Sequence, residues 1–119
     1  MHGWIGVDLD GTLAEYHTWQ GAASIGKPIQ PMVDRVKKWL SEGKTVKIFT
    51  ARVNPKSSGA ELARTAIAAW TNEVFGVELE STHEKDYGMI AVYDDRAVAI
   101  LRNKGIPYLS MGVDAPPRG

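Results

Sequence analysis

The chain has 119 residues, close to the length of one domain, and its 44% hydrophobic and 24% charged residues are ordinary for a globular protein. This composition excludes a disordered or collagen-like chain, and no apolar run approaches the roughly 20 residues that a membrane-spanning helix needs. Fourteen basic residues balance fourteen acidic ones, and there is no cysteine and no secretory signal at the start. We therefore expect a cytoplasmic protein with no membrane partner, no disulfide and no broad basic surface for nucleic acid.

The first part of the chain predicts two strands that flank a loop and a helix. Residues 5–10 form a short apolar run that ends in acids, as a buried strand leading into a loop does. Residues 11–30 mix glycines and aromatic residues and predict a long structured loop, or β-flap. Pro31 and the apolar residues that follow it at helical spacing predict a helix. Residues 45–49 predict the second strand, although Lys47 does not fit a strand that is buried on both faces.

A second helix is predicted after a turn at residues 54–55. Ser58 and Glu61 form a capping-box pattern at its start, and Gly76 ends it. Residues 77–79 then predict a short edge strand, and residues 89–93 an apolar strand that again ends in acids. The predicted apolar stripe of the helix consists of Leu62, Ala66, Ile67, Trp70 and Val74.

The last part of the chain predicts a helix at residues 97–103, a short strand at residues 107–110 and a frayed tail at residues 113–119. Strands that alternate with helices predict right-handed crossovers and an open parallel, Rossmann-like sheet. We therefore expect a single α/β domain over residues 1–119, built as a three-layer sandwich.

Polar side chains gather where the predicted strands end. Asp8 and Asp10 end the first strand, Thr50 follows the second, and Asp94 and Asp95 follow the strand at residues 89–93. Ligands of such sheets bind beyond the carboxyl ends of the strands, and carboxylates gathered there repel one another unless a cation lies among them. Oxygen ligands without sulfur suit Mg²⁺, so we expect these four carboxylates to form a magnesium site.

The run Asp-Leu-Asp-Gly-Thr at residues 8–12 resembles the DxDGT signature of the haloacid dehalogenase (HAD) superfamily, most of whose members are Mg²⁺-dependent phosphatases. Residues 47–50 resemble the second motif of this family, and Lys85 stands where the lysine of the third motif is expected. Asp94 and Asp95 resemble the DD form of the fourth motif. The resemblance covers residues 5 to about 110 and implies a HAD-like fold of the phosphatase type.

The resemblance also implies roles for the acidic residues. Asp8 attacks the phosphorus and becomes an aspartyl phosphate. Asp10 protonates the leaving oxygen, then deprotonates the attacking water, and its backbone carbonyl binds the metal. Asp94 ligates Mg²⁺, while Asp95 either shares this role or holds a metal-bound water.

The resemblance implies, further, that Thr50 donates a hydrogen bond to a phosphoryl oxygen and that Lys85 neutralises negative charge there. Lys56 is a rival for the role of Lys85, but it lies too far from the fourth motif. Lys27 and Arg52 are open to two interpretations, as ligands of a second anionic group or as solvated loop cations. The expected substrate-binding residues are Lys27, Thr50, Ala51, Arg52 and Lys85.

No segment is long enough for the cap domain that larger HAD proteins carry, because residues 13–49 and 51–84 are already used by the predicted elements. We therefore expect an open site that serves a macromolecular substrate or that a second copy covers in a homo-oligomer.

Arg52 and residues 94–96 resemble segments of the phosphatase half of polynucleotide kinase and of deoxyribonucleotidases, although the zero net charge does not support a polynucleotide. Trp19 is expected to line the entrance or a dimer contact. The histidines, including His83, are expected to lie in surface loops, with contact to substrate as the alternative for His17 in the flap.

The function predicted from the sequence is Mg²⁺-dependent hydrolysis of a phosphomonoester through an aspartyl-phosphate intermediate. One alternative is a phosphate-binding or regulatory module of the same fold without turnover. Another is a receiver-like signalling domain, which the order of the acids along the chain disfavours. A nucleotide or polynucleotide end phosphatase is the alternative for the specific activity.

Overall fold

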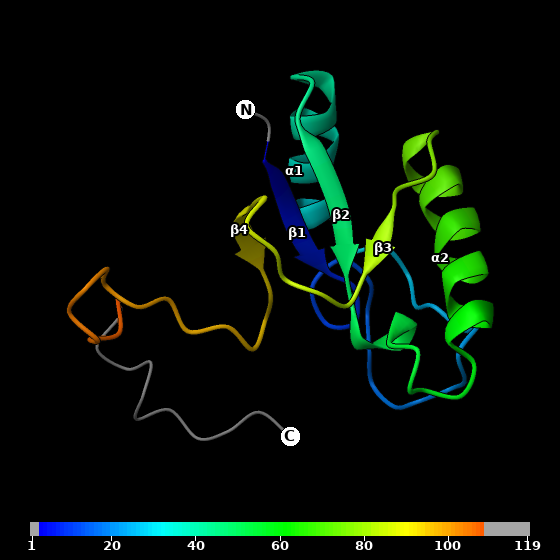
Figure 1. Cartoon of the computed structure of the whole chain (residues 1–119). Helices are drawn as coiled ribbons and strands as arrows, with labels where there is room; N and C mark the ends of the chain where they lie inside the picture. Colours follow the sequence, from blue (N-terminus) through cyan, green and yellow to red (C-terminus); the bar gives the residue numbers. More distant parts are fainter. Residues whose placement is uncertain (1–2, 109–119) are drawn as a thin grey trace.

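The computed structural model describes residues 3–108, which form a parallel sheet with two α-helices (Figure 1). The predicted tail at residues 113–119 and the end of the predicted last strand lie outside the described residues. No helix in this part of the chain is long and apolar enough to cross a membrane. In chain order the elements are β1 (Trp4–Asp8), α1 (Gln30–Ser41), β2 (Thr45–Phe49), the 3-10 turn η1 (Ala51–Val53), α2 (Ala60–Phe75), β3 (Ser81–Thr82) and β4 (Met89–Tyr93).

The sheet has the strand order β3-β2-β1-β4, and all of its pairs are parallel. The open parallel sheet that the sequence predicts is therefore confirmed. In the register of β1 and β2, Ile5 lies opposite Val46 and Val7 opposite Ile48, so these side chains share one face. All four are buried in the main hydrophobic core.

Both helices pack on this same face, because Val33 and Val36 of α1 and Ala63 and Ile67 of α2 belong to the core that Val7 helps to form. The chain moves in one direction from β1 to β2 to β3, and right-handed crossovers place successive helices on the same side when it does so. Within residues 3–108 the fold therefore has one helical layer against the sheet.

The opposite face of the sheet carries the lysine that the sequence left without an explanation. Lys47 Nζ lies 4.8 Å from the centre of the Trp4 ring and 3.6 Å from Glu80 Oε2. The connection from β3 to β4 crosses beside this ring, where Trp4 Nε1 donates to Asp86 Oδ1 at 2.8 Å. This bond, with a second from the Gly88 N–H, holds the pKa of Asp86 below its ordinary value. Since no helix covers this face in the described chain, the Lys47 side chain remains partly exposed to solvent.

The helix predicted at residues 97–103 is wrong. These residues turn back on themselves instead, with Leu101 N donating to Ile106 O at 2.8 Å and an isolated bridge between Ile100 and Pro107. Asn103 and Gly105 have φ angles of 62° and 69°, which no right-handed helix accommodates. The tight turn therefore replaces the helix, and of the predicted strand at residues 107–110 only Pro107 pairs within the described residues.

The capping box and the stripe of α2 also differ from the prediction. Gly59, with φ of 85°, is the N-cap, and no side chain caps the helix, so Ser58 does not close a capping box. Leu62 is 56% exposed. The rest of the predicted stripe is largely confirmed, because Ile67 is fully buried and Trp70 and Val74 pack against the core. The buried face of the helix also includes Ala63 and Thr71.

The edge strand predicted at residues 77–79 is likewise wrong, and β3 forms at Ser81–Thr82. The cause is the fully buried Thr71. Its hydroxyl donates to Ile67 O at 2.9 Å and accepts the N–H of Leu79 at 3.0 Å. This pairing holds the chain after Gly76 against the helix and leaves Leu79 in the core, so pairing with β2 starts later.

Replacement of Thr71 by Val should destabilise the protein by about 1–3 kcal/mol, because the buried N–H of Leu79 would lose its acceptor. Thr71→Ser keeps the acceptor and loses one methyl group, so about 0.8 kcal/mol is expected. Urea unfolding of the two variants and the parent measures both effects. A Ser variant that loses as much stability as the Val variant would show that packing, and not this hydrogen bond, holds the turn.

Candidate functional site

The candidate site lies beyond the carboxyl end of the sheet, around its central strand β1. Asp8 is the last residue of β1, and Thr50 follows β2 directly. Asp94 and Asp95 follow β4, which pairs with the other side of β1. From β1 to β3 each new strand is added on one side of the sheet, whereas β4 is added on the other side of β1. The site therefore lies at the point where the strand order reverses, which is where open α/β sheets bind ligands.

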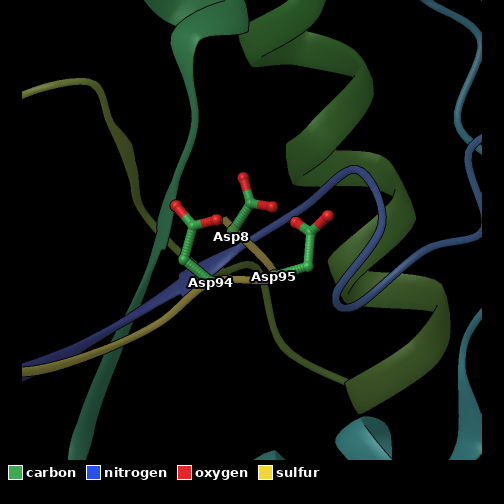
Figure 2. A group of neighbouring side chains, drawn as sticks. All are labelled: Asp8, Asp94 and Asp95. Carbon is green, nitrogen blue, oxygen red and sulfur yellow. The ribbon is translucent and has the colours of Figure 1, made fainter. Parts of the chain in front are cut away.

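Three of the predicted acids form one cluster. One carboxylate oxygen each of Asp8, Asp94 and Asp95 lies within 4.8 Å of the others. Figure 2 shows these carboxylates on the same side, Asp8 from β1 and the other two from the chain after β4. Residues far apart in the sequence are brought together because β1 and β4 are neighbours in the sheet.

The loop after β1 is tied to this cluster through Thr12. Its hydroxyl accepts the N–H of Asp95 at 3.0 Å and lies 3.2 Å from a carboxylate oxygen of both Asp8 and Asp95. The single hydroxyl proton serves one carboxylate at a time. Gly11 has φ of 88°, and a Cβ there would lie 3.0 Å from Asp95 Oδ2, so only glycine fits this approach without strain.

Burial raises the pKa of Asp8 from its ordinary value of 3.8 to about 8, and the charges of Asp94 and Asp95 contribute in the same direction. Without a cation, the ionised form of Asp8 is therefore unfavourable beside the other two carboxylates. A divalent cation among these oxygens would remove the repulsion and favour the ionised form of Asp8. All the donors are carboxylate oxygens, so the set fits Mg²⁺.

Asp10 lies outside the cluster, and its carboxylate is paired with Arg52. Arg52 Nε donates to Asp10 Oδ2 at 2.8 Å and a terminal nitrogen donates to Oδ1 at 2.9 Å. The Arg52 side chain is 5% exposed and also donates to the carbonyl of Ala22 at 3.0 Å. Each of the three guanidinium nitrogens of Arg52 therefore donates to a protein acceptor.

Thr50 is buried beside this pair. Its backbone N–H donates to Thr82 O at 2.9 Å, and its side-chain oxygen accepts the N–H of Arg52 at 3.2 Å. Among residues 3–108 its hydroxyl donates to no protein acceptor, so its proton is available to a ligand.

An open cleft of about 970 Å³ joins these groups. Lys27 and Lys85 do not line it; Lys27 borders a neighbouring hollow with Arg52, and Lys85 is exposed in the loop after β3. The predicted site residues that line the cleft are Asp8, Asp10, Thr50, Ala51, Arg52, Asp94 and Asp95.

Two cationic or titratable residues in the cleft, His83 and Arg96, were not given a role by the sequence. His83 directly follows β3. The position after a strand end is the signal that would have pointed to it, but β3 itself was predicted several residues too early. Arg96 directly follows the acidic pair, and its backbone N–H donates to Asp94 Oδ1 at 2.9 Å.

No family model, curated protein or solved structure matches the chain.

The raised pKa of Asp8 predicts a pH-dependent stability without metal. The unfolded chain ionises Asp8 near 3.8 and the native protein near 8, so the native state holds this proton more tightly. The corresponding stability is present at low pH and is lost as the pH rises toward 8. The melting temperature of Asp8→Asn in EDTA should therefore exceed that of the parent by more at about pH 8 than at about pH 5.

Thermal melts of both proteins across this range measure the difference, with Asp34→Asn as the control because Asp34 is an exposed carboxylate on α1. Added Mg²⁺ should stabilise the parent at about pH 8 and affect Asp8→Asn much less. If the difference in melting temperature between the parent and Asp8→Asn does not change with pH, the proton on Asp8 does not contribute to the stability of the native protein.

Proposed function

We propose that the protein is a Mg²⁺-dependent phosphohydrolase of the HAD type that cleaves a phosphomonoester through an aspartyl phosphate on Asp8. The observation that carries this proposal is the cluster of Asp8, Asp94 and Asp95 at the carboxyl ends of neighbouring strands, in an open cleft with Asp10 and Thr50. The order of the four motifs along the sequence supports the same function.

The proposal extends to the fold. A HAD-like three-layer sandwich would place a further helical layer over the sheet face that carries Trp4 and Lys47. On this face Val92 of β4, which lies opposite Gly6, is 40% exposed, as expected for a side chain that such a layer would cover.

In the first half of the reaction, a carboxylate oxygen of Asp8 attacks the phosphorus while the bond from phosphorus to the ester oxygen breaks. The proton that the leaving oxygen needs comes from the Asp10 carboxyl group. The products of this half are the free alcohol, the phosphorylated Asp8 and the Asp10 carboxylate.

In the second half, the Asp10 carboxylate takes a proton from water while the water oxygen attacks the phosphorus. The bond from phosphorus to Asp8 breaks, which releases inorganic phosphate and the free Asp8 carboxylate. Asp10 is then protonated as at the start, so the net reaction consumes one ester and one water molecule.

Asp8, Asp94, Asp95 and the backbone carbonyl of Asp10 would hold the metal. When bound, Mg²⁺ would neutralise charge on the phosphoryl group and on Asp8, so that two anions can approach each other. The Thr50 hydroxyl would donate to a phosphoryl oxygen. Lys85 does not line the cleft, so its loop would have to move toward the phosphoryl group for Lys85 to supply a further positive charge. A cleft without a cap admits a macromolecular substrate or a second copy of the chain.

The purified protein should release phosphate in the presence of Mg²⁺ and not in EDTA. The test panel contains p-nitrophenyl phosphate, nucleotides, sugar phosphates and oligonucleotides with a 3′- or 5′-phosphate. Asp8→Asn should lower kcat by about a thousandfold or more, because it removes the nucleophile. Asp10→Asn should lower it by about 10²–10⁴-fold, the usual contribution of proton transfer.

Asp34→Asn again serves as the control and should keep the parent activity, because Asp34 lies on α1 away from the cleft. Near-normal turnover by Asp8→Asn would exclude the covalent mechanism. No phosphate release from any substrate, with Mg²⁺ binding shown by calorimetry, would favour a binding or regulatory module instead.

A further inference from the structure

Arg52 joins two parts of the cleft that are distant in sequence. Its guanidinium makes two parallel bonds to the Asp10 carboxylate, at 2.8 and 2.9 Å. The remaining terminal nitrogen donates to the carbonyls of Gly21 and Ala22, at 3.4 and 3.0 Å. The guanidinium carbon also lies 4.8 Å from the centre of the Trp19 ring.

Gly21, Ala22 and Trp19 belong to the flap, which we define as residues 15–28. The base of the flap is closed by a bond from Glu15 N to Lys27 O at 2.9 Å, and Trp70 Nε1 donates to Gly26 O at 3.2 Å. These contacts hold the two ends of the flap. Ala22 and Ile25 also pack against the hydrophobic core. At the tip of the flap, the carbonyls of Gly21 and Ala22 and the ring of Trp19 all contact the Arg52 guanidinium.

The pair is too enclosed to be an ordinary surface salt bridge. The Arg52 side chain is 5% exposed and the Asp10 side chain 22% exposed. A buried guanidinium is tolerated only where its donors are matched, and here its nitrogens are matched by the carboxylate and the two carbonyls. A substrate anion would have to displace Asp10 to bind Arg52, so Arg52 is poorly placed as an anion ligand.

We propose that Arg52 is a positioning residue, which holds the Asp10 carboxyl group and the tip of the flap in one fixed arrangement at the cleft. The proposal rests on the proposed function, because it assigns to Arg52 the alignment of the group that protonates the leaving oxygen. A carboxylate offers about four lone-pair positions, and the side-on pairing with Arg52 uses two of them. The other two remain available, so that one can carry the proton that is given to the leaving oxygen and can then accept a proton from the attacking water.

A residue that aligns a proton donor affects substrates unequally. An alkyl phosphate expels a strongly basic oxygen and needs the proton from Asp10, whereas p-nitrophenyl phosphate expels a stable phenolate and needs it much less. Loss of alignment should therefore reduce kcat/KM for the alkyl ester far more than for the nitrophenyl ester. A loss of folding or of anion binding would reduce both alike.

The experiment compares Arg52→Gln and Arg52→Lys with Arg64→Gln. Arg64 is a suitable control because it also donates to backbone carbonyls, those of Ser81 and Val53, and does not line the cleft. For β-glycerophosphate, kcat/KM of Arg52→Gln should fall by about 10²-fold or more, and for p-nitrophenyl phosphate by less than about tenfold. Arg52→Lys should recover part of the loss, and Arg64→Gln should match the parent with both esters.

The flap is tested separately by limited chymotrypsin digestion, which needs no catalytic activity. Tyr16 and Trp19 are exposed aromatic residues in the flap. Cleavage after them should be about tenfold faster in Arg52→Gln than in the parent or in Arg64→Gln, because the tip loses its charge-assisted hydrogen bonds. Thermal melts verify that each variant is folded under the assay conditions, and Arg52→Lys replaces the Gln variant if that one does not fold.

Equal losses with both esters, or a change in KM alone, would overturn the role of Arg52 in aligning Asp10. Unchanged flap cleavage would overturn its role in holding the flap. A parent protein that hydrolyses no ester would instead contradict the proposed function, and with it the alignment of Asp10. Faster flap cleavage in Arg52→Gln would in that case still support the role of Arg52 in holding the tip of the flap.

Discussion

The mutual repulsion of Asp8, Asp94 and Asp95 is the constraint on which the rest of the site depends. These carboxylates approach within 4.8 Å although burial and neighbouring charge raise the pKa of Asp8 to about 8. The parallel pairing of β1 with β4 enforces this approach, and the Thr12 hydroxyl offers only one proton between two of the acids. Such an arrangement is unfavourable in itself and would be stabilised by a bound cation.

The segment after β1, which holds Asp10 and Thr12, is firmly anchored. Leu9 and Leu13 are fully buried, and the N–H groups of Leu13 and Ala14 both donate to Leu9 O. Asp10 and Thr12, which alternate with the buried residues, are therefore presented to the cleft from a rigid support. The same segment contacts the acidic pair through Thr12 and the flap through Asp10 and Arg52, so one short stretch of chain links all three parts of the site.

The predictions from sequence succeeded where a local pattern was sufficient. The strands at residues 45–49 and 89–93 were predicted with the observed bounds, since short apolar runs bounded by turns and acids identify strands. They failed where a distant or unusual contact decides. Thr71 delays β3 through its bond to Leu79, and the left-handed backbone of Asn103 and Gly105 replaces an expected helix by a turn. Periodicity carries no information about either.

The sequence by itself determined that residues 45–49 and 89–93 form strands and that polar residues, Thr50 and the pair Asp94 and Asp95, directly follow them. Only the tertiary structure decided how these side chains are used. Strand order places the acids that follow β4 beside Asp8, and the fold of the flap brings Arg52 to Asp10 rather than to solvent. Strand ends follow from local hydrophobic patterns, whereas ion pairs and clusters depend on which strands become neighbours and on how loops close.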